Sequence, residues 1–183
     1  MSADLFADLF LRDPWRRAVL DAVAALALPD WAVGAGFVRN AVWDRLHGYA
    51  APTPLDDVDV LYFDPADCAP GREEALERRL AEALPGVPWS MRNQARMHRR
   101  NGDAPYKDTE DAMRHWLESA TCVAVRLETD GRLGILAPFG LDDLLALRSG
   151  PTASGRARPA DYSARMRRKD WPARWPQVRV AGL

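Results

Sequence analysis

Two aspartates, Asp57 and Asp59, alternate with valines at the start of the run Asp57–Phe63, which is rich in β-branched and aromatic residues. Such a run favours a β-strand, and successive side chains of a strand point to opposite faces. Asp57 and Asp59 therefore share one face, while Val58 and Val60 face the core. Adjacent carboxylates repel each other unless a cation lies between them, and apolar surroundings strengthen the repulsion. A divalent cation such as Mg²⁺, which prefers oxygen ligands, would relieve this repulsion if it bound between the two carboxylates.

A turn of small residues precedes the acidic pair, in the run Val33-Gly34-Ala35-Gly36-Phe37. We predict that a strand ends here and that a helix begins near Phe37. Backbone N–H groups without bulky side chains can approach a ligand, and a helix N-terminus favours anions. Arg39 adds a cation one turn into this helix. The turn is therefore suited to phosphate.

Each motif also has a simpler explanation, because short motifs recur by chance. The two aspartates are also explained as the exposed end of a strand that pairs with nearby arginines. The glycines are also explained as residues of a tight turn that needs their backbone angles.

Taken together, the glycine turn and the later acidic strand resemble the polymerase-β-type nucleotidyltransferase superfamily. In that superfamily a Gly-Gly or Gly-Ser turn holds the triphosphate, and an Asp-X-Asp or Asp-X-Glu strand holds the metals. The run from Gly36 to Asn40 is similar to the Gly-Gly-X-Val-Arg-Asp of members that process tRNA ends or add poly(A), with Asn40 in place of Asp.

The chain is further similar to a bacterial family of small nucleotidyltransferase-like proteins, over roughly Pro29 to Pro176. The motifs that carry this resemblance are Trp31–Asp44, Leu46–Gly48, Asp57–Phe63, Asn93–His98 and Ala137–Asp143.

The resemblance implies a metal-dependent enzyme that moves a nucleoside monophosphate from an NTP to an acceptor, which RNA, a protein or a small molecule could supply. Asp57 and Asp59 are then the catalytic residues and the ligands of Mg²⁺ or Mn²⁺. The residues expected to bind the nucleotide are Gly34, Ala35, Gly36, Arg39, Asn40, Asn93, Gln94 and Arg96.

The sequence departs from the superfamily pattern at the third carboxylate, which is usual on the strand after the Asp-X-Asp helix. The corresponding run, Val87–Gln94, contains no acid, and Asn93 or Gln94 stands where one is expected. Glu118 and Glu128 are alternative sources. A second hypothesis is therefore a catalytically inactive module of the same fold that binds a nucleotide or RNA.

Apolar periodicity and turn residues predict an α+β (α/β-like) fold, with a small mixed sheet flanked by helices. The elements that must position the two motifs follow from these patterns. The expected helices cover residues 5–10, 14–28, 37–47, 72–84, 109–118 and 141–147, and the expected strands cover 57–63, 87–92 and a hairpin of 121–128 with 132–137 that turns at Asp130-Gly131.

The 183 residues suffice for one domain with its own core, and the net charge of −1 indicates no partner. The charge is uneven, because residues 150–183 carry a net charge of +6, which leaves −7 on residues 1–149. We expect residues 1–149 to form the nucleotidyltransferase-like domain and the basic C-terminal segment to pack on it through Tyr162, Trp171 and Trp175. That segment is also a possible contact for nucleic acid.

The sequence also indicates in which compartment of the cell the protein is expected. Cys68 and Cys122 show no metal-like spacing and are expected to be reduced thiols. The first eight residues contain acids where a signal peptide needs basic residues, and no apolar run approaches the length of a membrane span. We therefore expect a cytoplasmic protein without membrane contact.

Overall fold

The computed structural model of the chain describes residues 2–182, which fold around a five-stranded sheet of order β3-β2-β1-β4-β5. Strands β2 and β3 are parallel, and the other neighbouring pairs are antiparallel. The predicted mixed sheet flanked by helices is therefore confirmed. The strands are β1 (Ala32–Gly34), β2 (Val58–Tyr62), β3 (Trp89–Asn93), β4 (Ala124–Leu127) and β5 (Leu133–Leu136).

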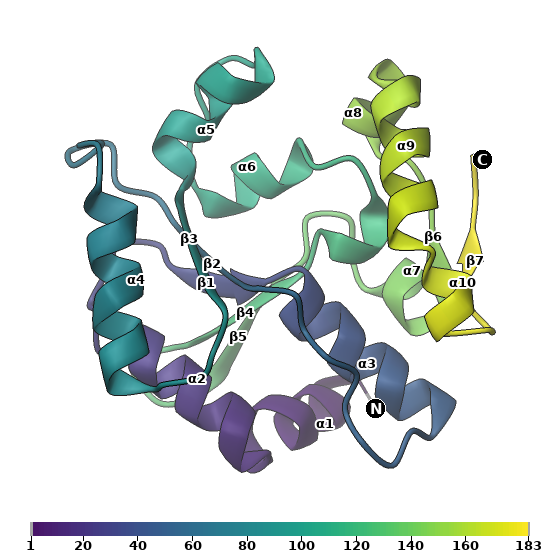
Figure 1. Ribbon diagram of the computed structural model, residues 1–183, viewed down its shortest axis with the longest axis horizontal. Coiled ribbons are helices and arrows are strands. Elements are labelled where there is room, and N and C mark those ends of the chain that lie inside the picture. Colours follow the sequence, from purple (N-terminus) through teal and green to yellow (C-terminus); the bar gives the residue numbers. More distant parts are fainter. Residues whose placement is uncertain (1, 183) are drawn as a thin grey trace.

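Helices surround this sheet on several sides (Figure 1). Helix α4 stands at one side of the view, α5 and α6 lie above the sheet, and the C-terminal helices stand opposite α4. None of the helices in residues 2–182 is long and apolar enough to cross a membrane. The helices are α1 (Ser2–Ala7), a π-helical turn (Asp8–Arg12), α2 (Pro14–Ala24), α3 (Gly36–His47), α4 (Arg72–Ala83), α5 (Gln94–Asn101), α6 (Thr109–Arg114), a 3₁₀ turn (Ser119–Thr121), α7 (Asp142–Leu145), α8 (Ala153–Ala157), α9 (Pro159–Lys169) and α10 (Trp171–Arg174).

The ends of α2 and α3 follow from their terminal residues. The carboxylate of Asp13 accepts a hydrogen bond from the backbone N–H of Arg16 at 2.8 Å, and Pro14 occupies the first turn. Gly48 ends α3 in the left-handed region, with φ of 67°. The sequence indicated the start of α2 and the end of α3 because these capping interactions are local.

Successive side chains of β2 point alternately into the main core and to the opposite face of the sheet. Val58, Val60 and Tyr62 are buried in the main hydrophobic core with residues of α2 and α4. Asp59 and Leu61 point to the opposite face, where Leu61 packs against Met113 of α6. The face that carries the aspartates is therefore the one not filled by the main core.

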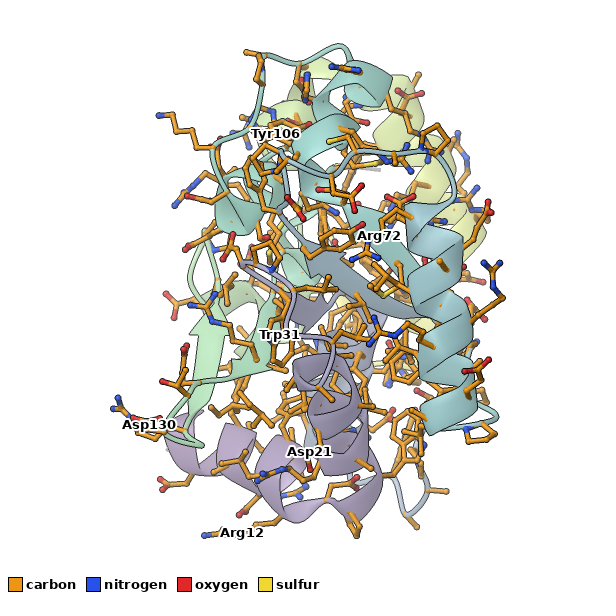
Figure 2. All side chains as sticks on the ribbon, turned by 90° about the vertical axis from the view of Figure 1, so that its left-hand side faces the viewer. Arg12, Asp21, Trp31, Arg72, Tyr106 and Asp130 are labelled. Carbon is orange, nitrogen blue, oxygen red and sulfur yellow. The ribbon has the colours of Figure 1, made fainter. Side chains whose placement is uncertain are left out.

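The hairpin of β4 and β5 projects away from the part of the molecule that contains α5 and α6. Figure 2 shows Asp130 at its tip and Tyr106 near the opposite end of the view. Gly131 has φ of 79°, which agrees with the predicted turn at Asp130-Gly131.

The structure has a shorter helix than the one predicted over residues 109–118. Helix α6 ends at Arg114, and its N-cap is Asp108. Residues 117–119 instead pair with the chain after β6. The backbone N–H of Thr152 donates to Leu117 O at 3.0 Å, and that of Ser119 donates to Gly150 O at 2.9 Å. Contacts made by a distant segment therefore override the local helical preference here.

The C-terminal segment packs on α3 through two tryptophans. The rings of Trp171 and Trp175 each contact the ring of Trp43 edge-on, with centroids 5.2 Å apart. Nε1 of Trp175 donates to the buried carboxylate of Asp44 at 2.8 Å. Two short strands, β6 (Arg148–Ser149) and β7 (Arg179–Val180), pair in parallel and connect the end of this segment to the chain just after α7.

We predict that Trp175→Ala lowers the free energy of unfolding by about 3 to 5 kcal/mol, because it removes a fully buried ring. It also leaves the Asp44 carboxylate without that donor. Trp15→Ala is the matched control, because 42% of Trp15 is exposed, and its effect should be much smaller. Urea unfolding of both variants measures the difference, and equal losses would contradict the prediction.

Candidate active site

A cleft of about 540 Å³ opens on the face of the sheet that carries Asp59. This volume lies within the usual range for a small-molecule site. Its walls come from the N-terminus of α3, the connector before β2, α5, the chain after α6, and α9. The cleft therefore brings together segments that lie far apart in the sequence, from Ala35 to Arg174.

Asp57 and Asp59 line this cleft together. The pKa of Asp59 rises from 3.8 to about 6, first because the group is buried and next because Asp57 lies beside it. The charges of Arg165, Arg92 and Lys169 oppose this rise of the pKa. Within residues 2–182, the side-chain ion pairs and hydrogen bonds of the neighbouring basic residues involve other acids, and none involves the carboxylate of Asp57 or Asp59.

This arrangement fits a divalent cation. Two carboxylates on one face supply hard oxygen ligands, and neither forms an ion pair with a basic side chain of residues 2–182. Within residues 2–182, no three His, Cys, Asp or Glu side chains are grouped so as to hold a metal ion, so the protein would supply the two aspartates alone.

The turn before α3 is shaped by close packing as well as by backbone angles. Gly34 lies directly across from Asp59 in the sheet. A Cβ atom at Gly34 would lie 3.0 Å from the Cβ of Ala124 and 3.1 Å from Val123 O, so glycine permits this approach. The residue with positive φ is Ala35, at φ 51° and ψ −119°, a strained conformation for a residue with a side chain.

The N-terminus of α3 opens into the cleft. Ala35 and Gly36 line it, and no side chain caps the first turn of the helix. The N–H groups and the dipole of this turn therefore remain suited to an anion.

Arg39 and Asn40 lie one turn into α3 and also line the cleft. Nη2 of Arg39 donates to Oδ1 of Asn40 at 2.8 Å. The guanidinium lies over the ring of Trp171, 4.6 Å from its centroid. Burial lowers the pKa of Arg39 to about 10, a value at which it keeps its charge near neutral pH.

Of the two alternative acids, Glu118 lines the cleft and Glu128 does not. Glu118 is 1% exposed, and its Oε1 accepts from Nε of Arg165 at 2.7 Å. Glu128 lies on the hairpin and pairs with Nε of Arg126 at 3.0 Å.

Among the other predicted residues, Gln94 lines the cleft, whereas Gly34, Asn93 and Arg96 are not part of its lining. The amide of Asn93 instead holds the loop after β2 through Asp64 O, at 2.8 Å. Arg96 pairs with Glu73 of α4. These two side chains therefore connect α5 to its neighbours.

Sequence reasoning missed much of the basic wall of the cleft. Helix α9 contributes Arg165, Arg168 and Lys169, and Lys169 also pairs with Asp56 at 3.6 Å. The signal was the excess of basic residues after Gly150, but their distance from Asp57 in the sequence did not indicate that they meet. The remaining basic residues of the lining are Arg39, Arg92, Arg100, Arg158 and Arg174.

An acidic pair on a sheet, a small-residue turn into an uncapped helix and a basic cleft between them define the class of nucleotidyltransferases. A family model described as "Nucleotidyltransferase" matches residues 21–180, so the chain belongs to this family. The predicted family and the prediction of a nucleotidyltransferase are thereby confirmed.

A solved structure supports the same conclusion. It is an NMR structure described as revealing a CCA-adding enzyme head domain, and it is 30% identical to the chain. The match covers 96% of this chain and 93% of that one, with a TM-score of 0.85. None of the curated proteins compared with the chain matches it.

We predict that Asp59→Asn stabilises the protein at pH 7.5 without added metal, by up to about 3 kcal/mol. The pKa of Asp59 is raised in the folded state to about 6, so wild-type stability falls as pH rises from about 4 through 6. The gain should disappear below pH 4, where the carboxyl group is protonated in both states.

Urea unfolding at several pH values measures this effect. Asp130→Asn is the matched control, since Asp130 pairs with Arg132 at the exposed hairpin tip and should give no such gain. A variant that is no more stable than wild type at pH 7.5 would contradict the raised pKa of Asp59.

Proposed function

We propose that the protein transfers a nucleoside monophosphate from an NTP to a hydroxyl of an acceptor, with release of pyrophosphate. One observation carries this proposal. Asp57 and Asp59, whose carboxylates form no ion pair within residues 2–182, line the same cleft as the uncapped N-terminus of α3. The similarity to a structure described as a CCA-adding enzyme head domain supports a nucleotide as the transferred group.

Each side chain has a role in this proposal. Asp57 and Asp59 hold Mg²⁺ or Mn²⁺, which supplies Lewis-acid stabilisation of the reacting phosphate when bound. The backbone N–H of Gly36 and those of the next residues in the first turn of α3 bind the outer phosphates, whereas the N–H of Ala35 already donates to Val123 O at 3.0 Å. Arg39, whose guanidinium lies over the ring of Trp171, stabilises the negative charge that grows on the leaving pyrophosphate.

We predict that Asp57→Asn or Asp59→Asn lowers transfer of a labelled nucleotide at least about 100-fold, because each removes a metal ligand. The assay contains Mg²⁺ or Mn²⁺, each of the four labelled NTPs and candidate acceptors that include RNA. Asp130→Asn is the control, since it makes the same change at the hairpin tip. Equal transfer by wild type and the Asp59 variant would refute the catalytic role.

A second candidate function is a nucleotide- or RNA-binding module without turnover. The observation that favours it is the lack, within residues 2–182, of a third metal-binding side chain beside the aspartates. Calorimetry with an NTP, with and without Mg²⁺, distinguishes the two. Metal-dependent binding together with no transfer to any acceptor supports the binding module.

The charge of the cleft favours an acceptor that itself carries phosphates, such as RNA. Eight basic residues line it against the four acids Asp56, Asp57, Asp59 and Glu118. The proposed metal offsets two of these acids, and ion pairs with Lys169 and Arg165 occupy the others. The remaining cations exceed what a single nucleotide requires, which disfavours a neutral small molecule or a protein side chain.

We predict that Arg168→Gln weakens binding to single-stranded RNA and lowers the slope of log K against log salt by about 1. Arg167→Gln is the matched control, because Arg167 is the neighbouring arginine of α9 but does not line the cleft. Fluorescence anisotropy with labelled RNA from low to moderate salt measures both. Identical slopes for the two variants, or no RNA binding at low salt, would exclude this contact.

A further inference from the structure

The two edges of the five-stranded sheet differ in how their backbone groups are occupied. At the β3 edge, the N–H of Met91 donates to the carboxylate of Glu77 at 2.7 Å. The N–H of Asn93 donates to the carboxylate of Glu73, also at 2.7 Å. Both glutamates belong to α4, so side chains occupy these donors of the β3 edge. The opposite edge is β5, whose one partner in the sheet is β4.

The ladder between β4 and β5 determines which backbone groups of β5 face outward. The N–H of Glu128 donates to Arg132 O at 2.9 Å, so these two residues form a hydrogen-bonded pair at the start of the ladder. Such pairs alternate with non-bonded pairs along an antiparallel ladder, so Leu133 and Ile135 direct their N–H and C=O groups away from β4. The turn and loop hydrogen bonds of residues 2–182 include none of these outward groups.

The side chains of β5 leave this edge open. The strand reads Leu133-Gly134-Ile135-Leu136 and contains no proline and no charged residue, which natural sheets commonly use to protect an exposed edge. Ile135 is 38% exposed although it is a large apolar residue. Figure 2 shows the hairpin, with Asp130 at its tip, at the outer margin of the molecule. The β5 edge is therefore accessible to a further strand.

The backbone of β5 is complementary to itself. In an antiparallel pair with a second copy, Leu133 of one copy can lie opposite Ile135 of the other, and each residue then exchanges both backbone hydrogen bonds with its counterpart. Gly134 lies opposite Gly134 of the second copy, at a non-bonded pair, where two strands approach most closely. Neither copy brings a Cβ atom to this point. One register therefore satisfies the outward groups of both edges.

The apolar side chains of β5 also match in this register. Ile135 pairs with Val125 of β4 across the ladder, and Val125 belongs to the main core. Leu133 points to the same face and packs against that core. Because Leu133 of each copy then lies beside Ile135 of the other, the two cores become continuous and the exposed isoleucines are covered.

The charges of the hairpin do not oppose such pairing. Glu128 forms an ion pair with Arg126, and Asp130 forms one with Arg132. The hairpin is therefore balanced in charge, and two copies can approach without net repulsion between these side chains. A two-fold interface uses the same surface of each copy, so a second copy is the partner that this self-complementary strand fits.

We propose that β5 is the interface between two copies of the chain, which join their sheets edge to edge about a two-fold axis. The axis passes between the two Gly134 residues and is perpendicular to the sheet. The faces that carry Asp59 therefore point to the same side of the joined sheet, and both clefts open on that side. This inference does not depend on the proposed function.

The first test is sedimentation velocity of the full chain from micromolar to near-millimolar concentration, where we expect an equilibrium between monomer and dimer. Ile135→Lys should raise the dissociation constant of the dimer at least about tenfold, because it places a charge in the apolar row at the edge. Leu46→Lys is the matched control and should leave the dimer unchanged, because Leu46 is 37% exposed and lies on α3, outside the hairpin.

Two further measurements test the backbone contacts. Ile135→Pro removes an outward N–H and keeps the ladder with β4, so it should also weaken the dimer at least about tenfold. Thermal melting checks that each variant folds. In wild type, hydrogen exchange of the peptide that contains β5 should slow as the protein concentration rises, because Leu133 and Ile135 then donate to the second copy. This measurement needs no variant and decides the question even if the variants do not fold.

Three outcomes would overturn the proposal. In the first, wild type stays monomeric at every concentration and exchange in β5 does not depend on concentration. In the second, a dimer forms but keeps its affinity in folded Ile135→Lys and Ile135→Pro, so that its interface lies elsewhere. In the third, Leu46→Lys weakens the dimer as much as Ile135→Lys does. None of these outcomes affects the proposed nucleotide transfer, which is measured separately.

Discussion

The repulsion between Asp57 and Asp59 is the constraint around which the rest of the molecule is organised. Alternation along β2 directs the neighbouring valines into the core and leaves both carboxylates on the opposite face. Burial, and next the charge of Asp57 just before the strand, raise the pKa of Asp59, so the chain holds an unfavourable charge on a strand with neighbours on both sides. Gly34, directly across the sheet from Asp59, allows the close approach of Val123 and Ala124 beside it. The unfavourable free energy of this arrangement is offset by the packing of the surrounding core.

Helix α9 completes the site without neutralising these carboxylates. Its Arg165 and Lys169 pair with Glu118 and Asp56, the two other acids that line the cleft. These two basic side chains are therefore paired with other acids of the cleft and not with Asp57 or Asp59. The burial of Trp171 and Trp175 against α3 fixes the segment that carries it. The same packing holds Arg39, so support for the fold and for the cleft comes from one set of contacts.

The sequence was informative wherever structure depends on neighbours along the chain. The cap at Asp13, the stop at Gly48, the Asp130-Gly131 turn and the facing of β2 follow from local geometry. It was uninformative where distant segments decide. The early end of α6 depends on pairing with the backbone near Thr152, and the position of Glu118 depends on Arg165. The contribution of α9 to the cleft, for the same reason, could not be read from the basic composition of the segment alone.

The position of α9 in the chain has a consequence for synthesis. The sheet and the acidic strand are complete by Leu136, whereas the tryptophans that hold α9 in place follow more than thirty residues later. The chain emerges from its N-terminus during synthesis, so the acidic strand leaves the ribosome before the segment that carries the basic wall. The cleft can therefore be completed only after α9 and the tryptophans that hold it have emerged, since they belong to the same core as the sheet.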